Sequence, residues 1–213
     1  MKNPFVLTLL TLAGSLLLTG CATSFPRGSA QFATQRAPAE SIRWPGAYDP
    51  ENAAFFVHNQ IEIEAPADVV WDILVHVEDW PNWYAGATDL TVNRGKHGRV
   101  TADSTVRWKT MGLRFDSKVR EFEPPARFAW ESRKAVIQGY HAWLLIPTAD
   151  GTRVITEESF NGFLAYLQGT FIPQKLHGLH QIFLEELKRK AEARVAAPAT
   201  TRTAPQAPRQ GRP

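Results

Sequence analysis

The stretch that decides the fold is IEIEAPADVVWDILVHVEDWPNWY, residues 61–84. It opens on the end of a segment in which apolar and polar residues alternate from position 57, and this period of two is typical of a strand with one buried face. Ala65-Pro66 ends the strand, and Pro66 suits the first turn of a helix. The next aliphatic residues recur three and four positions apart, which predicts an amphipathic helix. These residues are Val69, Val70, Ile73, Leu74 and Val77.

At the end of this stretch, Trp80-Pro81 and Trp83-Tyr84 form an aromatic turn or short helix, and a series of strand-like segments follows. The breaks between the segments have the composition of turns, and Asp150-Gly151 is a strong hairpin signal because the pair accepts a positive φ. Short connections predict that neighbouring strands are antiparallel. The predicted strands cover residues 89–94, 99–109, 113–123, 127–131, 136–146 and 152–160.

A long amphipathic helix closes the predicted domain. Pro173 fits its first turn, and a short helix is expected before it at residues 161–168. Spacings of four, three, four and four residues place its large apolar side chains on one stripe. The stripe consists of Ile172, Leu176, Leu179, Phe183 and Leu187. This order of elements predicts an α+β fold in which a curved antiparallel sheet wraps around the C-terminal helix and leaves a cavity between them.

Several motifs resemble the START-like superfamily, in its SRPBCC polyketide cyclase/dehydrase branch. They are Ala65-Pro66-Ala67, Val70-Trp71, Trp80-Pro81-Asn82-Trp83 and the hairpin TADGTRVITEES at residues 148–159. The resemblance covers residues 55–195 and implies a helix-grip fold that holds an apolar small molecule between sheet and helix. It is specific to the fold rather than to a reaction, because one fold hosts many chemistries.

Strand alternation is compatible with such a pocket. It places His141 in phase with Trp143, and Glu158 in phase with Phe160. Any single aromatic residue could instead fill the hydrophobic core. The predicted pocket therefore depends on these residues as a group and not on one of them. The predicted ligand contacts are Trp71, Trp83, Trp108, Phe115, Ser117, Trp130, His141, Trp143, Phe160, Leu176, Leu179 and Phe183.

Two polar residues on apolar strand faces form a candidate catalytic pair. If His141 and Glu158 point inward, burial shifts their pKa values toward ranges that suit acid/base chemistry. Glu157 is the alternative inward carboxylate if the register is shifted by one residue. A third interpretation leaves both side chains facing solvent, or bonded to each other for structural reasons.

No metal or other cofactor is predicted. His177 and His180 lie three positions apart on the last helix, but no carboxylate or third histidine stands at a partner spacing in the sequence. A Gly-x-Ser-x-Gly nucleophile elbow and a Walker-type loop are also missing from the sequence. The lack of a catalytic constellation favours a binding protein over an enzyme.

The N-terminus predicts export and lipidation. Lys2 precedes an apolar run at residues 5–18, which is shorter than the roughly 20 residues of a membrane-spanning helix and is typical of a signal peptide. Leu18-Thr19-Gly20-Cys21 resembles the lipobox of bacterial lipoproteins, which implies cleavage before Cys21 and acylation of its sulfur. The alternative is an ordinary signal peptide followed by a chance cysteine, although this is the only cysteine of the chain.

The predicted organisation has four parts: a signal peptide at 1–20, a lipidated tether at 21–54, the START-like domain at 55–195 and a disordered tail at 196–213. The tail is rich in Ala and Pro and has too little apolar surface to fold. The net charge of +3 at pH 7 collects after position 187, where seven basic residues accompany one acidic residue. The folded part is thus near neutral, and nucleic acid is not a predicted partner. The tail either contacts anionic envelope components or is a solvated end.

Three functions are compatible with these features. The first is a membrane-anchored envelope protein, on the outer membrane and facing the periplasm, that binds a hydrophobic small molecule or lipid in its cavity. The second is an enzyme of the cyclase/dehydratase kind that uses His141 and Glu158 as acid and base. The third is an envelope scaffold in which the cavity is filled and the tail is the contact surface; protein partners are not identified by the sequence.

Overall fold

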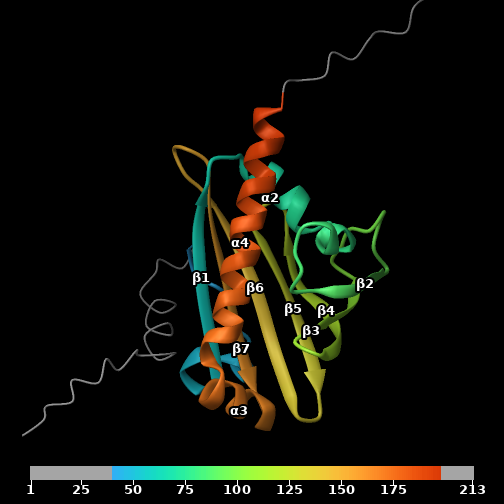
Figure 1. The fold of residues 1–213 in the computed structure, drawn as a ribbon, viewed down its shortest axis with the longest axis vertical. Helices are drawn as coiled ribbons and strands as arrows, with labels where there is room; N and C mark the ends of the chain where they lie inside the picture. The colour runs from blue at the N-terminus through green and yellow to red at the C-terminus, as the bar shows by residue number, and fades with distance from the viewer. Residues whose placement is uncertain (1–39, 198–213) are drawn as a thin grey trace, which may run out of the picture.

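The computed structural model describes residues 40–197, in which seven antiparallel strands form one sheet in the order β1-β7-β6-β5-β4-β3-β2. The sheet curves around the long helix α4, as Figure 1 shows. The strands are β1 (Phe55–Ile63), β2 (Thr88–Asn93), β3 (Thr105–Thr110), β4 (Leu113–Glu123), β5 (Arg127–Lys134), β6 (Ile137–Pro147) and β7 (Thr152–Asn161). The helices are η2 (Gly46–Tyr48), η3 (Pro50–Asn52), α2 (Ala67–Leu74), η4 (Val77–Asn82), α3 (Phe163–Phe171) and α4 (Pro173–Ala196). This is the predicted helix-grip fold.

The opening stretch folds as its pattern predicts. Pro66 is the residue that caps the start of α2, one position before the first helical turn in which it was expected. Trp80 and Pro81 lie in the 3-10 helix η4, and the Trp80 indole Nε1–H donates to the Leu74 carbonyl at 3.0 Å. This bond ties the aromatic turn to the end of α2 and directs the Trp80 ring into the core, where it is buried.

The β6–β7 hairpin brings the candidate pair together, because its register places His141 directly opposite Glu158. The Asp150–Gly151 turn joins the two strands as predicted, with Gly151 at φ 158°. Gly139 stands opposite Phe160, and a Cβ at this position would lie 2.7 Å from the Phe160 ring. The glycine therefore leaves room for the ring on the concave face of the sheet.

One predicted strand is shorter than expected. The strand predicted at 99–109 begins at Thr105, because the Val100 N–H donates to the Val75 carbonyl, next to the end of α2, instead of to a neighbouring strand. Residues 94–104 form turns instead, and Gly98 in this segment has φ 74°. The affected residues lie away from the cavity, so this error does not change the site.

The predicted apolar stripe of the last helix needs correction at two positions. Ile172 joins α3 to α4 and is exposed, and Leu179 is only half-buried. The core side of α4 is instead made by Leu176, His180, Phe183, Leu184, Leu187 and Ala191. Both sets follow the helical period, but the buried set extends the stripe to one side with His180, Leu184 and Ala191.

Part of the predicted tether belongs to the folded unit. Residues 40–54 cross the convex face of the sheet, where Ile42 and Tyr48 are buried in a second, smaller core. Trp44 packs edge-on against Phe56 and Tyr140, with ring centroids 5.8 and 5.7 Å away. The signal peptide, Cys21 and the tail beyond residue 197 are sequence predictions that lie outside the described residues.

Among residues 40–197, no helix combines the length and the apolar character that crossing a membrane requires.

Candidate ligand-binding cavity

A cavity of about 420 Å³ lies between the concave face of the sheet, α3 and α4. Its volume falls within the range of roughly 300–1,000 Å³ that is usual for small-molecule sites. The walls are mostly apolar, and their aromatic members are Trp80, Tyr84, Trp108, Phe115, Trp130, Trp143, Phe160, Phe171 and Phe183. Several of these rings pack on each other, as Phe128 behind the wall does on Trp143 at a centroid distance of 5.0 Å. The aromatic residues thus form both the core and the cavity wall.

The structure brings most of the predicted contact residues to this cavity. Those that line it are Trp108, Phe115, Trp130, His141, Trp143, Phe160, Leu176 and Phe183. Strand alternation and the helical period were sufficient to find them, because both assign side chains to a face without knowledge of the fold.

Four predicted contact residues do not line the cavity. The Trp71 ring packs on Phe122, with centroids 5.3 Å apart, and Trp83 covers the outer side of Phe183. Ser117 lies behind the wall and accepts the Trp108 Nε1–H at 2.8 Å. The last of the four, Leu179, sits on the flank of α4. These positions are on the correct elements, but other side chains separate them from the cavity.

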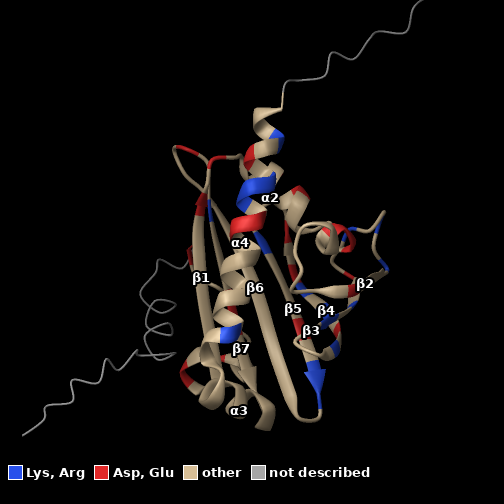
Figure 2. Ribbon diagram, viewed as in Figure 1, with Lys and Arg blue, Asp and Glu red and all other residues tan. Residues whose placement is uncertain are grey.

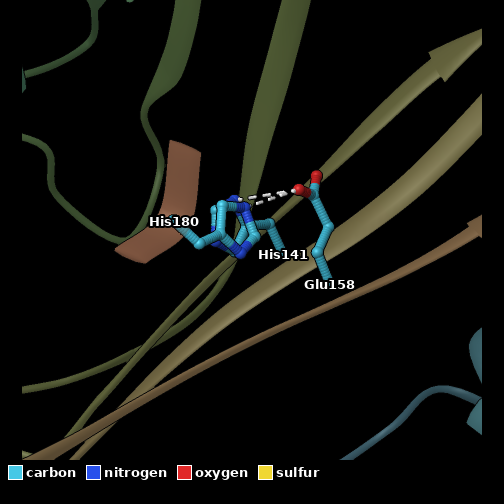
Figure 3. Close-up of side chains that lie close together, drawn as sticks. All are labelled: His141, Glu158 and His180. Carbon is cyan, nitrogen blue, oxygen red and sulfur yellow. Dashed lines mark ion pairs between the residues drawn. The ribbon is translucent and has the colours of Figure 1, made fainter. Parts of the chain in front are cut away.

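Three buried ionisable side chains form a polar cluster in the cavity wall. Figure 3 shows His141 from β6, Glu158 from β7 and His180 from α4, which we call the His–Glu–His cluster. Glu158 Oε2 lies 3.3 Å from His180 Nε2 and 3.5 Å from His141 Nδ1. The two imidazole rings stack, with centroids 4.6 Å apart and planes tilted by 16°. The predicted pair is therefore inward-facing, and α4 adds a third member.

The surroundings of the cluster favour its uncharged forms. Burial raises the pKa of Glu158, and the hydrogen bond and charge of His180 only partly oppose this effect. Burial also lowers the pKa of His141 well below its usual 6.5, and the nearby His180 adds to that shift. Both shifts have the same cause, because a charge loses its hydration inside an apolar wall.

Among residues 40–197, some nitrogen atoms of the His–Glu–His cluster make hydrogen bonds and others do not. His141 Nε2 is 2.8 Å from the Thr156 hydroxyl, and the ring stacks on Trp143 at a centroid distance of 3.8 Å. These two contacts fix the orientation of the His141 ring. The Nδ1 atoms of His141 and His180 are buried and make no hydrogen bond within the described residues. His141 Nδ1 still faces Glu158 Oε2 at 3.5 Å, so the polar atom that a ligand group would meet without a competing partner among the described residues is His180 Nδ1.

The cluster is also the group of described residues that comes nearest to a metal site. One ligand atom from each of the three side chains lies within 4.8 Å of the others. The sequence argument against a metal assumed that no carboxylate stands near the histidines of the last helix, and Glu158 now removes that assumption. Coordination, however, requires the lone pair of each imidazole to point at one ion, and these lie in the ring plane. Two nearly parallel, stacked rings do not converge in this way, so one ring would have to turn before an ion could bind.

Glu157, the alternative inward carboxylate, faces the opposite side of the sheet. It is fully buried, and its Oε1 lies 2.8 Å from His58 Nδ1 on the neighbouring strand β1. The register of β7 decides between the two carboxylates, since Thr156, Glu158 and Phe160 all line the cavity.

Sequence reasoning missed the contribution of α3 and the role of His180. The inner face of α3 lines the cavity with Leu164, Leu167, Gln168 and Phe171, which follow the period of a helix. The short helix predicted at 161–168 ended too early to show this pattern. His180 lies four residues after Leu176 and three before Phe183, so its place on the apolar stripe was also readable. Nothing in the sequence, however, pairs it with Glu158, which comes from another element.

Comparison with known proteins agrees with this architecture. Residues 54–192 match a family described as polyketide cyclase / dehydrase and lipid transport. No curated protein matches the chain.

Solved structures show the same fold. A hypothetical protein from Helicobacter pylori, jhp0584, is 24% identical, with a TM-score of 0.66 over 71% of this chain and 96% of that protein. TTHA0849 from Thermus thermophilus is 18% identical, with a TM-score of 0.54 over 67% and 99%. The di-domain ARO/CYC protein StfQ, from the steffimycin biosynthetic pathway, is 13% identical, with a TM-score of 0.57 over 67% of this chain and 52% of StfQ. The family match spans more than half of the sequence, and the chain therefore belongs to the polyketide cyclase/dehydrase family of START-like domains.

Proposed function

We propose that this protein binds an apolar small molecule or lipid in the cavity, while a lipid on Cys21 holds it at a membrane of the cell envelope. The observation that carries the binding function is the cavity of about 420 Å³ with its aromatic and aliphatic wall. Membership of a family whose description includes lipid transport supports the ligand class. Support for the anchor comes from the lipobox-like sequence at residues 18–21.

The His–Glu–His cluster defines the polar end of the ligand. Because Glu158 tends toward its protonated form and His141 toward its neutral form, the cluster offers hydrogen-bond donors and acceptors without a fixed charge. Such a site suits a hydroxyl, carbonyl or carboxylic acid group and disfavours a permanently charged group, which would lose its hydration without compensation. The ligand is thus an amphiphile with one uncharged polar end.

The binding function is tested by purifying the protein without detergent, extracting it with organic solvent and identifying the extracted molecules by mass spectrometry. Leu167→Trp places a larger side chain on the inner face of α3 and is expected to lower the amount of bound ligand. Tyr166→Trp, on the exposed outer face of the same helix, is the matched control and should leave the ligand content unchanged. The proposal is wrong if the parent protein carries no apolar species and also binds no added fluorescent fatty acid.

The anchor is tested separately by metabolic labelling with an alkyne-bearing fatty acid. The parent chain should carry the label and fractionate with membranes, whereas Cys21→Ser should lose both properties. Labelling that survives Cys21→Ser would contradict the assignment of the lipid to this residue.

A second function, dehydration or cyclisation of a polyketide-like substrate, is favoured by the geometry of the same cluster. Neutral His141 has the protonation state of a general base, and protonated Glu158 that of a general acid. In a dehydration, the base takes the proton next to a carbonyl while the acid protonates the departing hydroxyl, and an enone and water result. StfQ, a structural neighbour, is an ARO/CYC protein. The test is turnover of a β-hydroxy ketone, followed by enone absorbance; activity that survives both His141→Ala and Glu158→Gln would exclude this role.

A further inference from the structure

Helix α3 carries apolar residues on both of its faces. Its sequence, FLAYLQGTF, contains no charged residue. Leu164 and Leu167 point to the cavity, whereas Phe163 and Tyr166 point outward and are 65% and 60% exposed. A helix that covers a cavity needs only the inner apolar face, so covering the cavity does not explain the apolar residues of the outer face.

The outer face of α3 is part of a larger exposed apolar surface at one end of the molecule. It lies at the lower end in Figure 1, where α3 meets the turn between β5 and β6. The Leu164 N–H donates to the Val136 carbonyl of that turn at 3.0 Å. Most of the exposed large apolar side chains of the described chain gather here, and only Ile182 and Val195 lie elsewhere. We call this surface the α3 end; it consists of Val136, Phe163, Tyr166, Phe171 and Ile172.

The α3 end is continuous with the mouth of the cavity. Phe171 is 74% exposed, the largest value among these side chains, and yet it also lines the cavity. Ile172 does the same. A surface that covers the entrance to an apolar cavity, and is itself apolar, allows an apolar molecule to pass between the two without crossing water.

Basic residues border the α3 end. In Figure 2 the ribbon of α3 carries no charged position, and Lys or Arg positions, in blue, lie at the tip of β5 and near the start of α4. Lys134 Nζ is 5.9 Å from the centroid of Phe115, a cavity residue, and Lys175 is exposed in the first turn of α4. Arg133 is nearby but already pairs with Glu131, and two acidic residues, Glu51 in η3 and its N-cap Asp49, also lie at this end. An apolar face with a basic border is typical of proteins that lie at the surface of an anionic membrane.

We propose that the α3 end docks on an anionic lipid bilayer and presents the mouth of the cavity to it, so that the apolar ligand passes directly between bilayer and cavity. The passage of the ligand rests on the proposed function, whereas docking does not. The 18 residues at 22–39, between Cys21 and the described domain, span at most about 60 Å when fully extended. A lipid on Cys21 would therefore hold the α3 end within reach of the same bilayer.

Docking is tested by flotation of the full chain with lipid vesicles. All proteins carry Cys21→Ser, so that no lipid is attached and the N-terminal apolar segment contributes equally to each. The test variant is Phe163→Ser with Tyr166→Ser, which leaves the cavity wall intact. The matched control is Ile182→Ser with Val195→Ser, which removes two exposed apolar side chains from α4. Vesicles consist of phosphatidylcholine with or without phosphatidylglycerol.

We expect the test variant to partition about tenfold less onto anionic vesicles than the parent, because two aromatic side chains no longer enter the interface. The control variant should partition like the parent. Lys134→Glu should weaken binding to anionic vesicles and leave binding to phosphatidylcholine unchanged, since only the first depends on charge.

Three results would overturn the proposal: flotation of the test variant at the level of the parent, an equal loss in the control variant, or a parent dimer in analytical ultracentrifugation that the test variant abolishes. The last result would assign the α3 end to a second copy of the chain. Binding of cis-parinaric acid in solution separates docking from the proposed function. The test variant should bind this probe like the parent but receive it more slowly from donor vesicles. A parent that binds no probe would exclude ligand passage, while flotation would still decide docking.

Discussion

Glu131 on β5 and Glu158 on β7 are buried to almost the same extent, 7% and 5% exposed, but they lie on opposite faces of the sheet and their pKa values are shifted in opposite directions. On the convex face, Glu131 accepts hydrogen bonds from Tyr48 at 2.8 Å, from Arg120 Nε at 2.9 Å and from Arg133 Nε at 2.6 Å. Burial acts to raise the pKa of Glu131, but these bonds outweigh it, and the pKa is lowered. On the concave face, the ion-pair partners of Glu158 among the described residues are His141 and His180, and the pKa of Glu158 is raised.

The difference shows that, at equal burial, the partners of a carboxylate determine the direction in which its pKa shifts. On the convex face, Arg120, Arg133 and Tyr48 donate hydrogen bonds to Glu131. The bond from Tyr48 also ties residues 40–54 to the sheet. On the concave face, no Lys or Arg of residues 40–197 pairs with Glu158, and the histidines beside it keep Nδ1 atoms without a hydrogen bond there. A buried polar group in a cavity wall that lacks the hydrogen bonds or counter-charges to replace its lost hydration is typical of a functional site.

The largest effect on stability is expected on the convex face. Glu131→Ala removes an acceptor of four hydrogen bonds from three side chains and should lower the free energy of unfolding by about 3 kcal/mol at pH 7. Urea denaturation followed by circular dichroism measures this loss. Asp116→Ala is the control, because its ion pair with Arg107 is exposed and should contribute less than about 1 kcal/mol. Equal effects of the two substitutions would contradict the structural role of Glu131.

The pH dependence of this loss has a definite sign. A carboxylate with a lowered pKa stabilises the fold above its unfolded pKa of 4.5, and this contribution disappears as the pH falls through the lower folded value. The difference between parent and Glu131→Ala should therefore shrink when the pH is lowered below 4.5.

The opposite sign is expected on the concave face. Glu158→Gln should raise the free energy of unfolding by about 1–2 kcal/mol at pH 8, because a neutral amide replaces an acid that ionises readily only in the unfolded chain. A raised pKa stabilises the fold below the unfolded value of 4.5 and loses this contribution as the pH rises through the folded value. Parent and variant should thus converge at pH 4 and separate toward pH 8. Thermal unfolding at both pH values measures the difference, and a loss of stability at pH 8 would show that Glu158 is a structural residue.

Local patterns were sufficient to predict the fold. Alternation located the strands, and the Asp150-Gly151 turn set the register that places His141 opposite Glu158. The error at 99–104 arose because a backbone bond from Val100 to Val75, distant in the sequence, replaces strand pairing there. The aromatic residues Trp44 and Tyr48 indicated that part of the tether docks on the domain, but not where, since their partners lie on strands far along the chain.

The site could be predicted only in part, for the same reason. Strand alternation proposed His141 with either Glu158 or Glu157, and the register of β7 in the structure selects Glu158. The third member, His180, enters through packing of α4 on the sheet, and no spacing in the sequence measures that distance. Likewise, Trp71 and Leu179 lie on the predicted elements but on flanks of those elements that the fold turns away from the cavity.

The smallest effect on stability is expected from Tyr48→Phe. This substitution makes the surroundings of Glu131 more like those of Glu158, because it leaves Glu131 with fewer hydrogen-bond donors. Tyr48→Phe removes one donor from Glu131 and should raise the pKa of this carboxyl while lowering the free energy of unfolding by about 1 kcal/mol. In the parent, burial, followed by the neighbouring Glu131, raises the pKa of Tyr48 to about 12. Stability that Tyr48 contributes below pH 10 is therefore lost as the pH rises toward 12, and this loss should be absent in the variant.

Tyr140→Phe is the matched control for this substitution, because burial also raises the pKa of Tyr140 to about 12. The Tyr140 ring packs 5.7 Å from that of Tyr48, but no hydrogen bond among the described residues joins its hydroxyl to Glu131. Titration of the Glu131 side-chain carbon by NMR should shift upward only in Tyr48→Phe. An unchanged Glu131 titration in Tyr48→Phe would mean that the two arginines alone keep this carboxylate ionised. The contrast with Glu158 would then rest on the absence of a cation in the cavity rather than on the number of donors.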